Sequence, residues 1–311
     1  MAERPTHDRL PRTAQGTNAG AYTPLDWGLL ATTTLIWGAS FFFIEIALDS
    51  FTPGLITFLR VALGATALAV VPAARRPIGA NDWPRLALLG TIWVAVPFTL
   101  FPVAQQWINS SMAGMLNAAM PVMTALVTLL LARRLPGAWQ ATGLAIGLAG
   151  TVAVGWESLG EGSTTALGVG LVMAAVLCYS VSMNLAIPLQ QRYGTLRVML
   201  RVLMVATVLT APASVPGLRT ATWDPQAIAS VATLGVLGTG LAFVAMGTLA
   251  GRVGATRASV TTYLMPIVSI ALGAVVLDET IPGPARIGIV LELLGAWLVT
   301  RAERAAISDA G

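Results

Sequence analysis

The sequence lacks several residue types on which whole classes of function depend. Lysine is absent, so no G-x-x-x-x-G-K-[ST] phosphate-binding loop exists and ATP-driven pumping by this chain alone is not predicted. Cys178 is the only cysteine, which excludes an intramolecular disulfide. His7 is the only histidine and lies in a polar N-terminal segment. The sequence therefore predicts no metal site, no Cys–His nucleophile pair, no catalytic residue and no cofactor.

Charge is also scarce. Charged residues make up 10% of the 311 residues and hydrophobic residues 56%, whereas soluble domains average about 25% charged and about 45–50% apolar. The apolar residues form long blocks, and a helix of about 20 residues crosses the hydrocarbon layer of a bilayer. Alternation with a period of two is absent, which argues against a membrane barrel. The predicted class is an all-helical, polytopic membrane protein with the lipid bilayer as its surroundings.

Ten membrane-spanning helices are predicted, because lipid offers no partner for unpaired backbone groups. Their approximate limits are 25–48, 53–72, 83–103, 109–132, 138–155, 166–188, 195–214, 226–249, 254–277 and 284–301. Residues 1–24 are polar and predict a mobile cytoplasmic tail rather than a signal peptide. Residues 302–311 predict a second cytoplasmic tail.

Arginine sets the predicted orientation. If the N-terminus is cytoplasmic, the outer side holds only Arg219 and Arg286, and Arg60 lies inside a span. The inner segments then hold Arg4, Arg9, Arg12, Arg75, Arg76, Arg85, Arg133, Arg134, Arg192, Arg197, Arg201, Arg252, Arg257, Arg301 and Arg304. This asymmetry follows the positive-inside rule and places both termini in the cytoplasm. The basic residues are spread over separate segments, which argues against a nucleic-acid partner.

The second half of the sequence repeats the first. At a constant offset of 145, Pro121 falls on Pro266 and Phe98 on Phe243, and Trp37 falls on Tyr179 at an offset of 142. These matches predict two repeats of five spans, 25–155 and 166–301, joined by an outer loop at 156–165. Because five is an odd number, the second repeat should be inverted, an arrangement typical of secondary transporters with a substrate site near the midplane.

The same residues carry a family resemblance. The stretch R-V-G-A-T-R-A-S-V-T-T-Y-L-M-P-I-V-S-I-A-L-G-A-V-V-L-D-E-T at 252–280 resembles the second half of EamA-type transporters of the drug/metabolite transporter superfamily. L-I-W-G-A-S-F-F-F at 35–43, followed by Pro53 and Arg60, resembles their first two spans. One departure is that Glu279 matches a family glutamate, whereas its counterpart in the first half is Arg134.

The resemblance implies a fold and a function. Spans 1–4 and 6–9 would enclose a central cavity, and spans 5 and 10 would support it from outside. Alternating access through this cavity would export small metabolites, including amino acids, across the bacterial inner membrane.

Polar and aromatic residues in the middle of the cavity-forming spans are the candidates for substrate binding: Trp37, Trp93, Phe98, Gln105, Asn117, Tyr179, Phe243, Thr262 and Tyr263. The alternative is that the aromatic residues only fill gaps between helices, and for the tryptophans near span ends an interfacial belt is the preferred interpretation. Pro121 and Pro266 are predicted as paired hinges, since proline removes a helical hydrogen bond. Gly143-x-x-x-Gly147 predicts close helix packing.

Four charged residues are predicted within the membrane, namely Glu45, Arg60, Arg201 and Glu292. Glu45 and Arg60 lie at similar depth on consecutive spans, so an ion pair is the simplest account. Substrate contact and proton coupling are the alternatives. For Glu292 on the tenth span, packing or a homo-oligomer contact is expected, with protonation coupling left open.

The leading functional hypothesis is a secondary transporter that exports amino acids or similar amphipathic metabolites as its small-molecule substrates. A sugar-phosphate or nucleotide-sugar exchanger is the second, and it would need cationic side chains deep in both halves. A membrane-embedded enzyme would need clustered acidic, His or Cys side chains at one depth, which the sequence does not offer. A scaffold would not need an inverted duplication.

Overall fold

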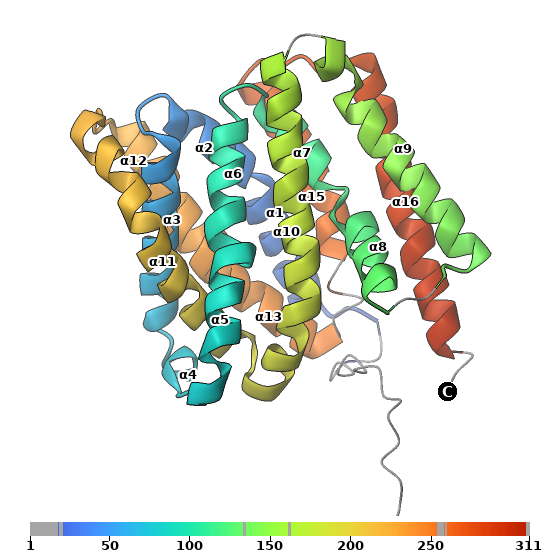
Figure 1. Cartoon of the computed structure of the whole chain (residues 1–311), viewed down its shortest axis with the longest axis horizontal. Helices are drawn as coiled ribbons and strands as arrows, with labels where there is room; N and C mark the ends of the chain where they lie inside the picture. The colour runs from blue at the N-terminus through green and yellow to red at the C-terminus, as the bar shows by residue number, and fades with distance from the viewer. Residues whose placement is uncertain are drawn as a thin grey trace, which may run out of the picture.

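A computed structural model describes residue 18 and residues 21–132, 135–160, 163–253, 258 and 260–308, and within these ranges every regular element is a helix (Figure 1). The helices up to residue 160 are α1 (Pro24–Gly38), α2 (Ser40–Leu48), α3 (Pro53–Ala69), α4 (Pro72–Arg75), η1 (Ala80–Asp82), α5 (Trp83–Leu89), the π-helix η2 (Gly90–Ala95), α6 (Val96–Ala104), α7 (Ser110–Asn117), α8 (Met120–Ala132) and α9 (Ala138–Gly160). Those after it are α10 (Ser163–Tyr193), α11 (Thr195–Thr220), α12 (Pro225–Ala232), the π-helix η3 (Thr233–Leu241), α13 (Ala242–Val253), α15 (Val260–Val276) and α16 (Gly283–Ser308).

Seven segments of the described chain are long and apolar enough to cross a membrane: Pro24–Leu48, Ala80–Ala104, Ser110–Leu131, Ala138–Trp156, Thr165–Met183, Thr195–Thr220 and Pro225–Val253. The shorter apolar helices Pro53–Ala69 and Thr261–Val276 coincide with two further predicted spans, and the last predicted span lies within α16. Residues 156–160 and 163–165, which were expected to form a loop, are helical.

Several predicted spans are interrupted, which the sequence interpretation missed. The first span breaks at Ala39 between α1 and α2, and the fourth breaks at Ala118–Ala119 between α7 and α8. The third and eighth spans each contain a π-helical segment, η2 and η3. The first and fourth spans have the sixth and ninth spans as counterparts in the other half. These counterparts, α10 and α15, run without a break through the described residues. The two halves therefore differ in conformation.

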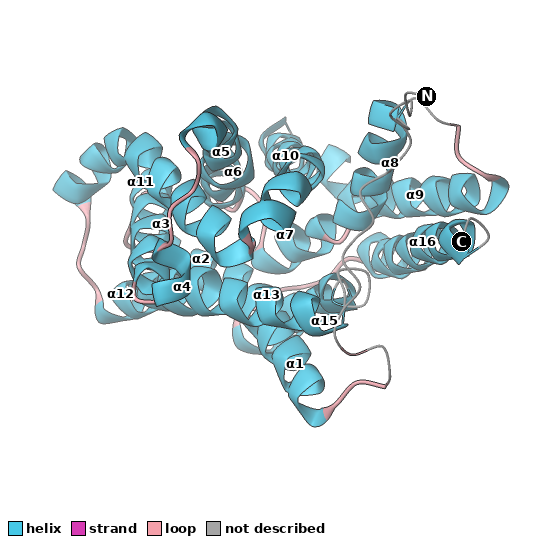
Figure 2. Ribbon diagram, turned by 90° about the horizontal axis from the view of Figure 1, so that it is seen from below, coloured by secondary structure: helices cyan, strands magenta, loops and turns pink. Residues whose placement is uncertain are grey.

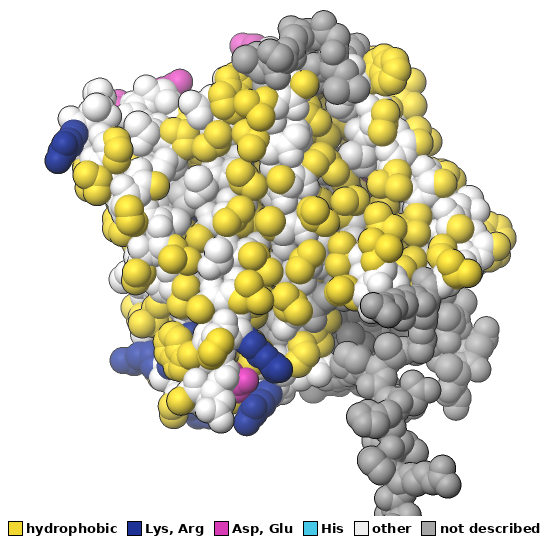
Figure 3. All heavy atoms as spheres, viewed as in Figure 1, with side chains coloured by type: hydrophobic (Ala, Val, Ile, Leu, Met, Phe, Trp, Pro, Cys, Tyr) yellow, Lys and Arg dark blue, Asp and Glu magenta, His cyan; other side chains and the backbone are white. Residues whose placement is uncertain are grey.

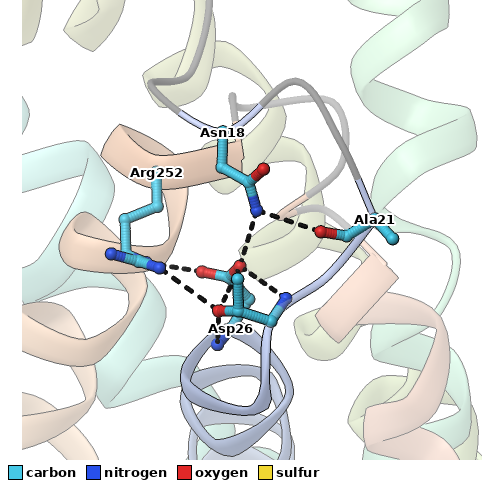
Figure 4. A network of polar contacts seen from close by, with 5 residues as sticks. Asn18, Ala21, Asp26 and Arg252 are labelled. Carbon is cyan, nitrogen blue, oxygen red and sulfur yellow. Dashed lines mark hydrogen bonds and ion pairs between the residues drawn. The ribbon is translucent and has the colours of Figure 1, made fainter.

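The start of α1 is anchored by a polar network (Figure 4). Thr23 and Asp26 form a capping box, which satisfies backbone donors of the first turn. Asp26 also accepts from Asn18 Nδ2 at 2.9 Å and forms an ion pair with Arg252 of α13 at 2.5 Å. Asn18, Thr23 and Asp26 therefore link the start of α1 to α13.

The helices pack in matched pairs. Helix α3 packs on α11, α7 on α15 and α9 on α16, so each pairs with its counterpart in the other half. The crossed pairs are matched too: α1 contacts α13 as α10 contacts α6, and α3 contacts η3 as α11 contacts η2. The two halves are thus interleaved rather than adjacent. This arrangement packs η2 against α11 and η3 against α3, each from the opposite half.

Helices α9 and α16 lie side by side at one end of the molecule (Figures 1 and 2). A Cβ atom built on Gly143 would lie 2.9 Å from the Gly295 carbonyl oxygen, and one on Gly150 would lie 2.6 Å from Glu292 N. No side chain fits at these positions without displacing the neighbouring backbone. The small-residue spacing predicted from the sequence therefore serves close packing of α9 against α16.

Apolar side chains cover most of the visible face of the molecule, and dark-blue arginines gather at its lower edge around α4 and α5 (Figure 3). The tryptophans predicted for the interfacial belt are all more than two-fifths exposed: Trp27, Trp83, Trp139, Trp156 and Trp297. An exposed apolar surface of this extent matches a helix bundle solvated by lipid.

Candidate binding site

Aromatic rings from both halves meet between α1, η2 and α13. The Phe243 ring of α13 lies edge-on to Trp37 of α1 at 5.7 Å and to Trp93 of η2 at 6.4 Å. The Trp37 indole Nε1–H donates to the Gly238 carbonyl oxygen of η3 at 3.0 Å. These three predicted residues therefore do come together, and we call them the aromatic cluster.

A buried arginine lies next to this cluster. Arg60 of α3 is 7% exposed, and its Cζ atom lies 4.2 Å from the centroid of the Phe98 ring on α6. Its Nε–H donates to Thr239 Oγ1 at 3.3 Å, and the Thr239 hydroxyl donates in turn to the Leu234 carbonyl oxygen. The ion pairs among the described residues are Arg192–Asp82 and Arg252–Asp26. Arg60 is in neither of them.

The π-helices hold these groups in place through close glycine contacts. A Cβ atom on Gly90 of η2 would lie 2.6 Å from Val205 of α11, and one on Gly235 of η3 would lie 2.5 Å from Leu63 of α3. Each π-helix therefore lies directly against the partner helix from the opposite half. A π-helical turn also rotates the residues that follow it, and such turns are frequent at functional sites.

More rings extend from Phe98 along α6. Phe101 stacks on Tyr179 of α10 at 5.9 Å and lies edge-on to Phe41 of α2 at 5.3 Å. The Thr57 hydroxyl donates to the Phe98 carbonyl oxygen at 2.9 Å, which ties α3 to α6. Tyr179, predicted from its match to Trp37, therefore stacks on Phe101 and forms no ring contact with the aromatic cluster.

Glu45 of α2 binds Gln105 at the end of α6 and does not bind Arg60. Gln105 Nε2 donates to Glu45 Oε2 at 3.0 Å and to the Phe41 carbonyl oxygen at 2.9 Å. Gln105 and Phe98 are seven residues apart, which is about 10 Å along a helix. The predicted Glu45–Arg60 ion pair is therefore wrong, because Glu45 and Arg60 bind residues that lie about 10 Å apart along α6.

Glu279 closes the contact between α15 and α7. Its carboxylate accepts from the backbone N–H groups of Ser110 and Ser111, each at 2.9 Å, and from the Ser110 hydroxyl at 2.7 Å. The acceptor oxygens thus satisfy free donors at the N-terminus of α7, where the helix dipole also favours negative charge. In the first half, Arg134 occupies the matching sequence position, and it lies outside the described residues.

Two of the predicted charges do not line this region. Arg201 donates to the carbonyl oxygens of Ala74, Arg75 and Arg76, so it binds the end of α4 rather than a substrate pathway. Arg201, predicted as a charge within the membrane, is therefore held by the backbone at the end of α4. Glu292 is fully buried on α16 against α9, and neither of its carboxylate oxygens has a hydrogen-bond partner among the described residues. The nearby Thr151 hydroxyl donates to the Gly147 carbonyl oxygen and is the polar side chain next to the Glu292 carboxyl group.

The remaining predicted residues are Tyr263, Asn117, Thr262 and the two hinge prolines. The Tyr263 hydroxyl donates to the Ala296 carbonyl oxygen at 3.1 Å, so Tyr263 faces α16 and not the aromatic cluster. Asn117 and Thr262 are buried, and each lies four residues before a predicted hinge proline. Pro266 lies inside α15, but Pro121 lies in the first turn of α8, where a missing N–H group breaks no helical bond. The two prolines are therefore not equivalent in this structure.

The profile of EamA-like transporters matches the chain twice, over residues 27–156 and 166–301. The chain belongs to the EamA-like transporter family. It is therefore a multi-pass membrane protein of a transporter family.

Relatives of this EamA-like chain include an uncharacterized transporter of Archaeoglobus fulgidus, 24% identical over 88% of this chain and 98% of that protein. A probable terminal-alkyne amino-acid exporter of Streptantibioticus cattleyicolor is 28% identical over 88% and 93% of the two chains. A probable amino-acid metabolite efflux pump of Escherichia coli is 26% identical over 87% and 93%. A crystal structure that is 20% identical superposes with a TM-score of 0.63 over 90% of this chain and 98% of the other, which shows a shared fold.

The sequence interpretation of this EamA-like chain missed Thr239, Gly238 and Phe101, which contact the predicted residues directly. The cluster of glycines in T-L-G-V-L-G-T-G-L at 233–241 was the available signal, since glycine inside a span allows another backbone or a large side chain to approach closely. Phe101 carried no signal of its own among the many apolar residues of its span.

Proposed function

We propose that this chain is a secondary transporter that exports amino acids or similar small amphipathic metabolites by alternating access. The observation that carries the proposal is the position of Arg60 beside the aromatic cluster, between interleaved halves of a chain from a transporter family. Aromatic and apolar walls with few polar groups are typical of sites for small amphipathic ligands. Two relatives are named as an amino-acid exporter and an amino-acid metabolite efflux pump, which agrees with this substrate class.

The proposed architecture is ten spans in two inverted repeats, with Arg219 and Arg286 on the outer side and both termini in the cytoplasm of a bacterial cell. The two family matches and the matched packing of the helices support the duplication. In alternating access each half adopts in turn the conformation of the other. Breaks in α1–α2 and α7–α8 opposite the unbroken α10 and α15 are the kind of difference that such a cycle requires.

A sugar-phosphate exchanger is less well supported. It would need several cations to bind a doubly charged group, and Arg201 is occupied by backbone carbonyl oxygens of α4. Enzymatic activity has no supporting observation either, because the acidic side chains Glu45, Glu279 and Glu292 lie in three different contacts.

The proposal is tested by reconstituting the purified protein in liposomes preloaded with labelled amino acids and measuring efflux. Apolar amino acids should leave faster than from protein-free liposomes. Trp93→Ala should abolish most of this efflux, because Trp93 is 8% exposed within the aromatic cluster. Trp139→Ala is the matched control, since Trp139 is 73% exposed on α9, and it should retain full activity. Efflux of sugar phosphates alone, or equal loss in both variants, would contradict the proposal.

A further inference from the structure

We propose that Arg60 is the anchor for the carboxylate group of the substrate, so that the transported class is small monocarboxylates with an apolar side chain, such as leucine. This inference rests on the proposed function and adds the recognition element. It starts from the Arg60 guanidinium, a charge without a counter-ion among the described residues. A guanidinium group stays protonated in proteins, and burying it unpaired is costly, so its retention needs a reason.

The contacts of Arg60 leave the correct atoms available. One face of the guanidinium is covered by the Phe98 ring, and Nε is engaged by Thr239. The Nη atoms form no hydrogen bond to any described residue. These atoms form the fork that binds a carboxylate through two parallel hydrogen bonds. The ring beneath the guanidinium limits its rotation, so the fork keeps its direction before a ligand arrives.

Gly238 of η3, which has no side chain, lies next to the Nη edge of Arg60. A Cβ atom on Gly238 would lie 4.0 Å from Arg60 Nη2 and 3.5 Å from Ser40 Oγ. Any larger residue at Gly238 would therefore project toward the guanidinium. The Trp37 indole donates to the carbonyl oxygen of the same Gly238. Gly238 therefore contacts the aromatic cluster and also lies next to the Arg60 guanidinium. A carboxylate on Arg60 would thus place an attached apolar group against Trp37 and Phe243.

The acidic residues of this region, Glu45 and Glu279, bind groups other than Arg60. The carboxylate that pairs with Arg60 in this proposal therefore belongs to the ligand. Glu45 is bound by Gln105, about 10 Å further along α6. Glu279 is bound by the N-terminus of α7. An α-ammonium group could instead lie against the faces of the cluster rings, as cations do on tryptophan. One cation without an acidic neighbour matches a singly charged carboxylate better than a phosphate dianion.

The test compares L-leucine with L-leucinamide, which differ in the carboxylate alone. Ligand-induced thermal stabilisation of the purified full-length protein measures affinity for each, because a ligand that binds only the folded state raises the melting temperature. The wild-type protein should bind leucine at least about tenfold more tightly than leucinamide. In Arg60→Met this preference should disappear, with leucine falling to the affinity of the amide.

Arg201→Met is the matched control, since Arg201 is the counterpart of Arg60 in the second half but binds α4. It should lower the melting temperature and keep the preference for the acid. If Arg60→Met does not fold, Arg60→Lys supplies the same readout, with a preference that is reduced but present. A variant at position 60 that keeps the full preference, or that loses both ligands equally, overturns the carboxylate anchor. If the wild-type protein neither binds nor exports any amino acid, the proposed function itself fails.

Discussion

At the scale of single residues, three glutamates of this chain illustrate three ways in which a membrane protein treats a carboxylate. Glu45 accepts from the amide of Gln105, and Glu279 accepts from the N-terminus of α7. Glu292 is fully buried without a partner within the described residues. The effect of each substitution on the free energy of unfolding therefore depends on the hydrogen-bond partner of the carboxylate and not on its depth in the membrane alone.

For Glu45, a double-mutant cycle distinguishes the two candidate partners. Glu45→Gln combined with Gln105→Ala should give a coupling energy of about 1 kcal/mol, because both changes remove one charge-assisted hydrogen bond. Glu45→Gln combined with Arg60→Met should be additive within about 0.5 kcal/mol. Equilibrium unfolding of the purified variants measures both values. Coupling to Arg60 that exceeds coupling to Gln105 would restore the ion pair that the sequence suggested.

For Glu292, replacement by an apolar residue of similar length should stabilise the protein. Glu292→Met removes a buried carboxyl group that lacks a hydrogen bond, a change worth about 1–3 kcal/mol. Methionine is unbranched, so it fits beside Gly150, whereas a branched side chain would meet α9. Thermal unfolding in detergent should show a higher melting temperature. A lower one would mean that the carboxyl group makes a favourable contact inside the α9–α16 interface, for example with the Thr151 hydroxyl.

At the scale of helices, the sequence predicted where apolar helices occur but not where they break. The apolar blocks around α3, α9 and α11 were enough to predict these helices, because the hydropathy of a segment depends only on the residues of that segment. The breaks at Ala39 and Ala118–Ala119 and the π-helices η2 and η3 depend on the helix packed alongside, which hydropathy does not contain. The same reason explains the site: Trp37, Trp93 and Phe243 were predicted, whereas the hydrogen-bond partners of Arg60 and Glu45 were not.

The contact of Glu279 with α7 gives a prediction at this scale. Glu279→Ala leaves three donors of Ser110 and Ser111 without an acceptor and should cost about 2–3 kcal/mol of folding free energy. Glu279→Gln keeps one acceptor oxygen and should lose about half of that. Asp278→Asn is the control, because Asp278 is exposed and asparagine tolerates its positive φ of 52°. Chemical unfolding followed by tryptophan fluorescence measures all three. Equal effects at both positions would contradict the capping role.

At the scale of the whole molecule, the apolar surface and the arginines at one edge predict how the protein lies in the membrane (Figure 3). In a Cys178→Ser background, a cysteine at Thr220 should react with an impermeant thiol reagent added outside intact cells. A cysteine at Arg76 should react only after permeabilisation, because inner loops collect positive charge. External labelling at position 76 would contradict the proposed orientation.

The contact between α9 and α16 also affects how the chain is made. Helix α9 ends at Gly160 and α16 begins at Gly283, roughly 120 residues later. At synthesis rates of about 5–20 residues per second, α9 waits roughly 6–25 s in the membrane before its partner emerges. During this interval its glycine-lined face, shaped for another backbone, is covered by lipid or by the insertion machinery. A ribosome that stalls within residues 160–283 therefore leaves this face of α9 without its partner helix.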